Sequence, residues 1–390
     1  MEKSISEQIN EKAQEIASQM TQENKRYDEI RNSGRVFTMF QTDDVIANQK
    51  EVVTAPLWSD EIATLDSFYT NSLQTNDQKQ YYYEIFQTGS SLTNAQPQFS
   101  VAYGHKLGSG SYSGSNGLST YPSKAIYAQY KQLLLDPGQT VFTFKGGVTS
   151  NQIYVVNINR ARFKERIDPG NIQLNLAELN GDSYANNAFS GSVVAINASD
   201  KVIQLIDDSG DTGETVTSVV NSSRVYNIVS GTIDNGVYSG DTTGYGLFYP
   251  EKGVMVLNAD VLDISCSFNS VTSSNKNGDN AFKLFTSISG SAVINSASYS
   301  FQGRSSETLT STHYFVRAKA PEYNFSNNPS FATASTGNLS QPDFVGNPRT
   351  YITTVGLYNE KQELLAVAKV SQPLLKSFNK ELVIKCKLDY

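Results

Sequence analysis

The spacing of apolar residues at the start of the chain predicts a helix. Between residues 5 and 30, apolar side chains recur at intervals of three and four, among them Ile9, Ile16 and Met20. This is an amphipathic pattern with nearly heptad spacing. Such a helix either lies on its own domain or bundles with other chains, and four interrupted heptads do not decide between the two. We treat residues 1–35 as an N-terminal helical arm.

Residues 36–170 predict a mixed α+β domain. The segment YPSKAIYAQYKQLLLD has apolar residues at helical spacing, with Ser123 as the candidate N-cap and a Pro-Gly pair after its end. The segment QIYVVNINR is typical of a strand. A glycine-rich run at 104–117 would lose much conformational entropy in a core element, so it predicts an exposed, flexible loop.

Residues 171–310 predict an all-β domain. Short runs of β-branched and aromatic residues alternate with turn-forming residues, at a spacing of about 8–15 residues. This arrangement is typical of an antiparallel sandwich or barrel and disfavours alternating strands and helices. The runs are GSVVAINA, KVIQLID, RVYNIVSG, YGLFYP, KGVMVLNA, AFKLFTS and SASYSFQ.

Residues 311–390 predict a C-terminal β region with a hairpin, because the apolar runs YITTVGLY and LLAVAKV flank the polar NEKQE. The last segment alternates in polarity, which predicts a half-buried strand in which Cys386 packs as a small apolar residue. We therefore expect a mainly β protein with antiparallel sandwich-like or barrel-like domains and a few short helices. The apolar face of the last strand carries Leu382, Ile384, Cys386 and Leu388.

Charge and composition disfavour several partners. Lys and Arg number 31 against 38 acidic residues, a net charge of −7, and no dense basic block occurs, so we expect no nucleic-acid partner. Cys266 and Cys386 match neither a zinc-ligand spacing nor a disulfide framework, which favours synthesis in a reducing cytosol. The N-terminus lacks the apolar core of a signal peptide, and no apolar run of about 18 residues occurs, so we expect neither standard export nor a membrane partner.

Motifs that resemble ligand-binding loops do not meet the requirements of those loops. In GSGSYSG the third glycine is one place late for a dinucleotide fingerprint. The segment DDSGDTGE (207–214) resembles a calcium loop, but Thr212 stands where a glycine is required, so a solvated turn is favoured. His105 and His313 lack the context of a base that activates a nucleophile. We expect no catalytic, cofactor-binding or metal-binding residue, although a carboxylate pair that meets only in the fold stays open.

A basic segment near the middle of the chain is a candidate contact. Arg160, Arg162, Lys164 and Arg166 are interspersed with Phe163 and Ile167, and the sequence DPGN that follows predicts a turn into the strand IQLNL. The segment is either a solvated turn with Arg–acid pairs or a subunit contact in which guanidinium groups meet the carboxylates of a neighbour.

Six blocks between residues 102 and 390 carry a family resemblance. They read AYGHKLGSGS, YPSKAIYAQYKQLLLD, IYVVNINRARFKERIDPGNIQLNLAEL, YGLFYPEKGVMVLNA, FVRAKAPEYNFSNNPSF and GNPRTYITTVGLYNEKQELLAVAKVSQPLLKSF. Together they resemble virion structural proteins of T4-like contractile-tailed bacteriophages, the group that includes cyanophages. The hairpin is also similar to segments of tail and baseplate components.

This resemblance implies a non-enzymatic subunit of a virion, assembled in the host cytoplasm and repeated in a homo-oligomeric ring or in multiple copies beside other tail, baseplate or neck subunits. It carries no catalytic residues. A neck or capsid-associated protein and a receptor-binding or glycan-binding tail module are alternatives, although the trimeric repeats of a fibre component are absent. A cell-wall-degrading tail enzyme would need an acid pair in a cleft.

The hairpin is the main candidate contact from the sequence. Its two runs carry small or apolar residues on both faces, which fits a hairpin with one face on its own domain and one on a neighbouring subunit. The alternative is a hairpin that lies wholly inside its domain. We select Tyr351 and Leu357 as candidate interface residues, together with Ile9, Ile16, Met20, Arg160, Arg162 and Arg166.

Overall fold

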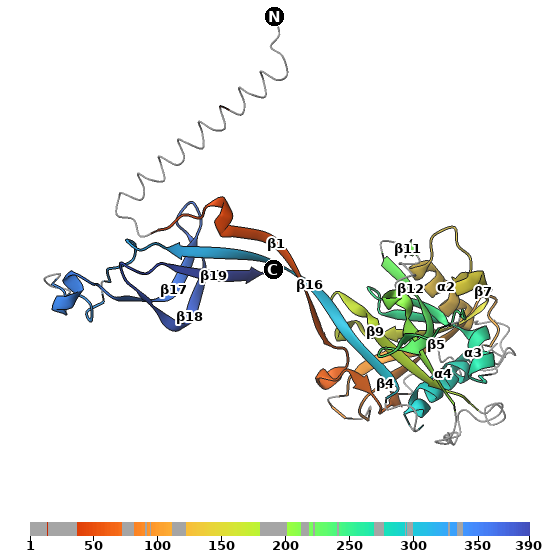
Figure 1. Ribbon diagram of the computed structural model, residues 1–390. Helices are drawn as coiled ribbons and strands as arrows, with labels where there is room; N and C mark the ends of the chain where they lie inside the picture. Colours follow the sequence, from red (N-terminus) through yellow and green to blue (C-terminus); the bar gives the residue numbers. More distant parts are fainter. Residues whose placement is uncertain are drawn as a thin grey trace, which may run out of the picture. The chain divides into compact units, whose positions relative to one another are not determined.

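The protein is mainly β and divides into two compact units (Figure 1). The smaller unit contains the described residues of 37–51 and 309–390, and the larger contains those of 52–308. Strands β1 (Val45–Pro56) and β16 (Phe301–Ala318) contribute to both. The computed structural model describes residues 14, 37–71, 82–89, 92–93, 95–110, 122–179, 201–211, 218–220, 223–239, 242–268, 277–292, 294, 299–326, 328–333 and 338–390.

The larger unit is built on one antiparallel sheet with the strand order β16-β9-β10-β12-β14-β15-β8-β5-β4-β3. Strand β2 pairs with β16, β11 and β13 pair with β12, and β6 and β7 form a separate pair. These strands are β2 (Thr64–Leu65), β3 (Tyr69–Asn71), β4 (Tyr82–Phe86), β5 (Pro97–His105), β6 (Phe142–Phe144), β7 (Val148–Ser150), β8 (Gln152–Ile158), β9 (Arg166–Ala177), β10 (Val202–Asp207), β11 (Ser218–Val220), β12 (Ser223–Thr232), β13 (Gly236–Val237), β14 (Gly246–Tyr249) and β15 (Val254–Asn258).

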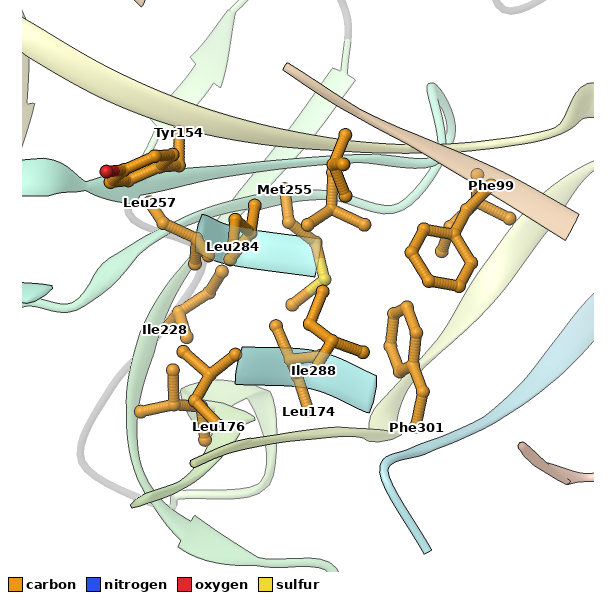
Figure 2. Packing of buried hydrophobic residues seen from close by; sticks show 14 of the residues in the cluster. Phe99, Tyr154, Leu174, Leu176, Ile228, Met255, Leu257, Leu284, Ile288 and Phe301 are labelled. Atoms are coloured by element: carbon orange, nitrogen blue, oxygen red, sulfur yellow. The ribbon is translucent and has the colours of Figure 1, made fainter. Parts of the chain in front are cut away.

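A helix occupies the centre of the larger unit. Helix α4 (Asn277–Ser291) packs against β9, β5 and β4, strands from distant parts of the sheet, so the sheet curves around it. Figure 2 shows Leu284 and Ile288 among apolar side chains from several strands. Its side chains from residue 280 to residue 291 are buried or half-buried, like those of a helix in the interior of a large protein.

The other face of the sheet is covered by helix α2 (Pro122–Leu134) and by the β6–β7 pair. Strand β8 shows the division, because Tyr154 belongs to the inner core whereas Ile153 and Val155 belong to the outer one. Gly104 in β5 lets α2 approach closely, since a Cβ there would lie 2.9 Å from the backbone nitrogen of Tyr127. Burial on both faces explains why these strands read as continuous apolar runs.

The smaller unit consists of a hairpin packed on one side of a sheet. Strand β19 (Leu382–Asp389) pairs antiparallel with β16, and β17 (Thr350–Tyr358) pairs with β18 (Leu364–Lys376). The predicted hairpin and the predicted half-buried last strand are thereby confirmed. The core of this unit is small: its buried members are Val355, Leu357 and Cys386, with Tyr314, Val316, Ala366, Ala368, Ile384 and Leu388 half-buried around them.

Several sequence predictions need correction. The predicted domains 36–170 and 171–310 are not separate, because β8 pairs with both β5 and β15 and residues 52–308 form one unit, whereas residues 37–51 belong to the smaller unit. The region 171–310 is not all β, since AFKLFTS belongs to α4 and α3 (Ala259–Ser265) directly follows β15. The predicted turn DPGN is a bulge inside β9, where the pairing with β16 shifts register. The α2 helix is confirmed, but Ser123 lies inside it and donates a hydrogen bond to the Ser109 carbonyl instead of capping it.

Candidate functional site

The hairpin of the smaller unit has one buried face and one exposed face. Val355 lies opposite Ala368 and Leu357 opposite Ala366, and these four side chains form its inner face, against β16 and β19. Directly opposite residues of an antiparallel pair point to the same side. The next pairs, Gly356 with Val367 and Tyr358 with Leu364, are exposed.

The exposed pairs form a continuous apolar surface, which we call the outer hairpin face: Tyr358, Leu364 and Val367 around Gly356. A Cβ on Gly356 would lie 2.8 Å from the Tyr358 ring and 3.2 Å from Leu364, so both side chains cover this glycine. Phe37 packs edge-on against the ring of Tyr358, with 5.1 Å between centroids. An exposed cluster of this kind is typical of an interaction surface.

A buried lysine fixes the base of the hairpin. The ammonium of Lys376 donates hydrogen bonds to the carbonyls of Ala320 and Ser377 and to the side-chain oxygen of Asn324, at 2.8–3.0 Å. Burial lowers the pKa of Lys376, and Glu322 and Glu381 oppose that shift. Three neutral acceptors satisfy its three donors, so the hairpin is attached to residues 320–324 by polar as well as apolar contacts.

The structure separates the two interface candidates in the hairpin. Tyr351 is exposed over 62% of its surface, as a contact residue must be before assembly. Leu357 is 8% exposed and packs in the unit's own core, so we no longer assign it to an interface. Ile9, Ile16 and Met20 lie outside the described residues.

The arginine candidates already have partners within the chain. Arg160 stacks on Phe163, with 4.5 Å to the ring centroid, and donates hydrogen bonds to the carbonyls of Lys164 and Glu165. Arg162 donates to the side chains of Ser59 and Gln96. A second contact of either arginine with another chain stays a prediction.

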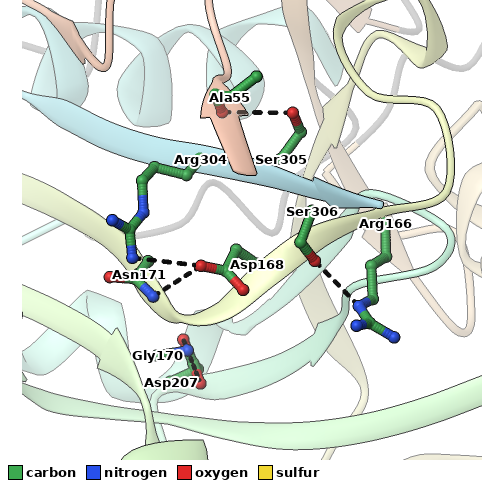
Figure 3. Close-up of polar contacts among 9 residues, drawn as sticks. All are labelled: Ala55, Arg166, Asp168, Gly170, Asn171, Asp207, Arg304, Ser305 and Ser306. Atoms are coloured by element: carbon green, nitrogen blue, oxygen red, sulfur yellow. Dashed lines mark hydrogen bonds and ion pairs between the residues drawn. The ribbon is translucent and has the colours of Figure 1, made fainter. Parts of the chain in front are cut away.

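The third arginine helps to hold the bulged part of β9 (Figure 3). Arg166 donates to the Ser306 hydroxyl at 2.9 Å, and Asp168 accepts from Arg304. The backbone N–H of Gly170, at φ +79°, donates to the carboxylate of Asp207. These contacts tie the bulge to β16 and β10, which gives Arg166 a structural role within the fold.

The other motifs also have structural roles where they are described. Gly104 lies in a buried strand and not in the predicted loop, whose residues 111–117 lie outside the described residues. His105 accepts hydrogen bonds from the backbone N–H groups of Leu107 and Ser109, and burial lowers its pKa. His313 lies in β16, with Ser311 at 3.4 Å.

The solvated turn predicted for residues 207–214 is wrong for its first two residues. Asp207 and Asp208 are buried, and Asp208 accepts hydrogen bonds from the backbone and side chain of Asn227. Burial raises the pKa of Asp207. Across the described ranges, no group of three or more His, Cys, Asp or Glu side chains is placed to hold a metal ion. Nor is any described helix long and apolar enough to cross a membrane.

Sequence reasoning missed the outer hairpin face itself. It selected Tyr351 and Leu357, whereas Tyr358, Leu364 and Val367 make the continuous exposed surface. Their apolar character was visible in the sequence, but their side of the hairpin was not. Comparison of the chain with protein-family models, with curated proteins and with solved structures finds no match.

Proposed function

We propose that the protein is a non-enzymatic structural subunit of a phage virion, in the tail or baseplate, and that it contacts a neighbouring subunit through the outer hairpin face. The observation that carries the proposal is the one-sided packing of the hairpin. Its inner face is buried in the smaller unit, while the apolar side chains of Tyr358, Leu364 and Val367 are exposed. Apolar residues in such a cluster lose contact with water when a partner covers them, which favours association.

The form of the hairpin supports the same role. It is a two-stranded sheet, and isolated two-stranded hairpins are marginally stable in water. Here the inner face and Lys376 attach it to its unit, so the outer face can be presented without unfolding. The resemblance of six sequence blocks to phage structural proteins supplies the kind of partner, which is another tail, baseplate or neck subunit or a second copy in a ring.

A neck or capsid-associated structural protein is the closest alternative, because it would use the same kind of contact. Cryo-electron microscopy of intact particles separates the positions. We expect the density of this chain in a ring or in repeated copies of the tail or baseplate, with the outer hairpin face against a neighbour. Density only at the neck or capsid would select the alternative.

Assembly is tested with two valines of similar exposure. Val367 is exposed over 57% on the outer hairpin face, and Val148 over 52% in β7 of the larger unit. Val367→Glu places a charge in the proposed contact, so we expect a folded protein, by its melting temperature, that mass spectrometry no longer finds in purified particles. Val148→Glu is the control and should assemble. Normal incorporation of Val367→Glu contradicts the proposal.

A further inference from the structure

A groove of about 590 Å³ lies on the outer face of the sheet of the larger unit. Its floor comes from β4, β5 and β8, and one wall comes from α2. Arg160 and Lys252 also line the groove. The volume falls within the ~300–1,000 Å³ usual for small-molecule sites. The groove belongs wholly to the larger unit and is separate from the hairpin.

Several residues that line the groove are small, which leaves room for the hollow. Ser100 and Ala102 of β5 and Ala125 of α2 line it together with the larger side chains of Tyr82 and Tyr130. Tyr82 lies opposite Ala102, so the ring stands beside a position with almost no side chain.

The floor carries a row of polar groups across three strands. Ser100 pairs with Glu84 on one side and with Asn157 on the other, so the three side chains share one face. On the same face of β8, Ile153 and Val155 are buried beneath α2. The sheet surface thus changes from apolar to polar where the groove begins.

The charged groups of the groove differ in how they are paired. Arg160 is held by carbonyls of its own turn and by the ring of Phe163. The carboxylate of Glu84 and the ammonium of Lys252 have no hydrogen bond or ion pair with any described residue. The groove therefore offers one carboxylate and one ammonium without partners among the described residues, beside the paired guanidinium of Arg160 and tyrosine, serine and amide groups.

We propose that this groove binds a neutral saccharide. Hydroxyl groups both donate and accept, so one sugar can donate to Glu84 and accept from Lys252 without carrying a charge that either residue would repel. The apolar face of a sugar ring can lie against Tyr82, whose ring is exposed and whose hydroxyl can also form hydrogen bonds. An apolar ligand would have to desolvate both charged groups, which is costly.

A peptide strand is a less suitable occupant. Strands β5 and β8 are paired on both sides within the sheet, and β4 pairs with β5 along its length and with β3 at Glu84–Phe86, so the described residues offer little free backbone edge for strand addition. The proposal does not depend on assembly into a virion, because every residue it uses lies in one unit of one chain.

The test is binding of neutral glycans by the purified full-length protein. An array of neutral oligosaccharides is screened first, with maltohexaose and chitohexaose as defined members and a heparin hexasaccharide as the anionic contrast. We expect at least one neutral glycan to bind and the heparin fragment not to bind. The affinity for the bound glycan is then measured by calorimetry.

The variants locate the binding. Tyr82→Ala should weaken binding about tenfold or more, as truncation of a central aromatic contact commonly does. Tyr238→Ala is the matched control, since Tyr238 is 41% and Tyr82 43% exposed, and it should leave the affinity unchanged. Ser100→Leu fills the floor and should abolish binding, with the melting temperature as the check on folding.

Three results would overturn the proposal. The first is an array on which no neutral glycan binds. The second is glycan binding that Tyr82→Ala and Ser100→Leu leave unchanged, and the third is binding of a peptide, but of no glycan, that depends on Tyr82.

Discussion

The larger unit covers both faces of its sheet, whereas the smaller unit covers only one face of its hairpin. In the larger unit α4 fills the inside of the sheet and α2 lies on the outside, so β8 and β15 are buried on both faces. In the smaller unit β17 and β18 are buried only on the side that meets β16 and β19. An apolar run on both faces of a strand therefore predicts that both faces pack against other residues, but it does not predict that those residues belong to the same chain.

Removal of the last strand should have the largest effect. Deleting residues 381–390 strips Leu382, Ile384 and Leu388 from the inner side of the smaller unit, at up to about 2–5 kcal/mol for each large side chain. The summed loss approaches the free energy of unfolding of a typical domain, which is about 5–15 kcal/mol. Hydrogen exchange should show unprotected amides in β17 and β18 and unchanged protection in β5 and β8. Persistent protection of the hairpin would show that it folds without β19.

The core of the larger unit should respond strongly to one truncation. Leu284→Ala in α4 removes a fully buried side chain, and we expect the free energy of unfolding to fall by about 2–5 kcal/mol. Ile264→Ala in α3 is the control, because Ile264 is exposed and should change that free energy by less than about 0.5 kcal/mol. Denaturant titration measures both. Equal effects would mean that α4 is not the centre of the core.

The two faces of the hairpin should differ in the free chain. Leu357→Ala on the inner face should destabilise the smaller unit by about 2 kcal/mol, at the low end for a buried leucine because this core is small. Val367→Ala on the outer face should change stability by less than about 0.5 kcal/mol. Urea titration followed by hydrogen exchange of β18 measures both. A larger loss for Val367→Ala would reverse the assignment of the faces.

Each unit contains one buried cysteine, so the rates at which the two thiols react compare how readily each unit opens. Burial raises the pKa of both Cys266 and Cys386, so both thiols should react slowly in the native protein. We expect Cys386 to react with a disulfide reagent about tenfold faster, because the smaller core should open at lower free energy. Single-cysteine variants Cys266→Ala and Cys386→Ala assign the two rates. Faster reaction of Cys266 would contradict the comparison.

The smallest effect is expected from an ion pair in the smaller unit. Burial opposes ionisation of Asp44, but the Gln41 amide and the Arg317 guanidinium outweigh it and lower the pKa of Asp44. A lowered carboxyl pKa stabilises the folded state above the unfolded pKa and is lost as the pH falls through the folded one. Asp44→Asn should therefore slightly destabilise the unit at pH 7, since Arg317 is half exposed, and the difference should vanish as the pH falls through the lowered pKa of Asp44. A difference that grows in acid would have the wrong sign.

The sequence predicted individual strands better than it predicted which strands pair with one another. The alternation of Leu382 to Leu388 defined β19, and the polar insert NEKQE defined the hairpin turn. Helix α4 was missed because Phe, Ile and Thr in that segment favour a strand, although Ala281, Leu284 and Ile288 fit a helical spacing. The merger of two predicted domains was missed because it depends on pairing of β8 with β15 across about a hundred residues, which local patterns do not encode.

The sequence predicted the hairpin that carries the candidate site, but not which face of the hairpin is exposed. The hairpin pairing shifts register between Ile352 and Thr354 and again between Leu357 and Tyr358. Residues 355–358 of β17 alternate between the inner and the outer face, but small or apolar residues occur on both faces, so the sequence cannot show which face is buried. In β18 the second shift leaves Leu365 as an extra residue, so counting from Ala366 would place Leu364 on the wrong face. The groove on the larger unit was unpredictable for a related reason, because Glu84, Ser100 and Asn157 meet only through strand pairing.

Hydroxyl-radical footprinting tests whether a neighbouring subunit covers the outer hairpin face, because it labels exposed side chains in the free chain and in assembled particles. Tyr358, Leu364 and Val367 should be labelled in the free chain and protected after assembly, while Val355 and Leu357 on the inner face should be protected in both. Equal labelling of Tyr358, Leu364 and Val367 in free and assembled protein would contradict the claim that a neighbouring subunit covers this face.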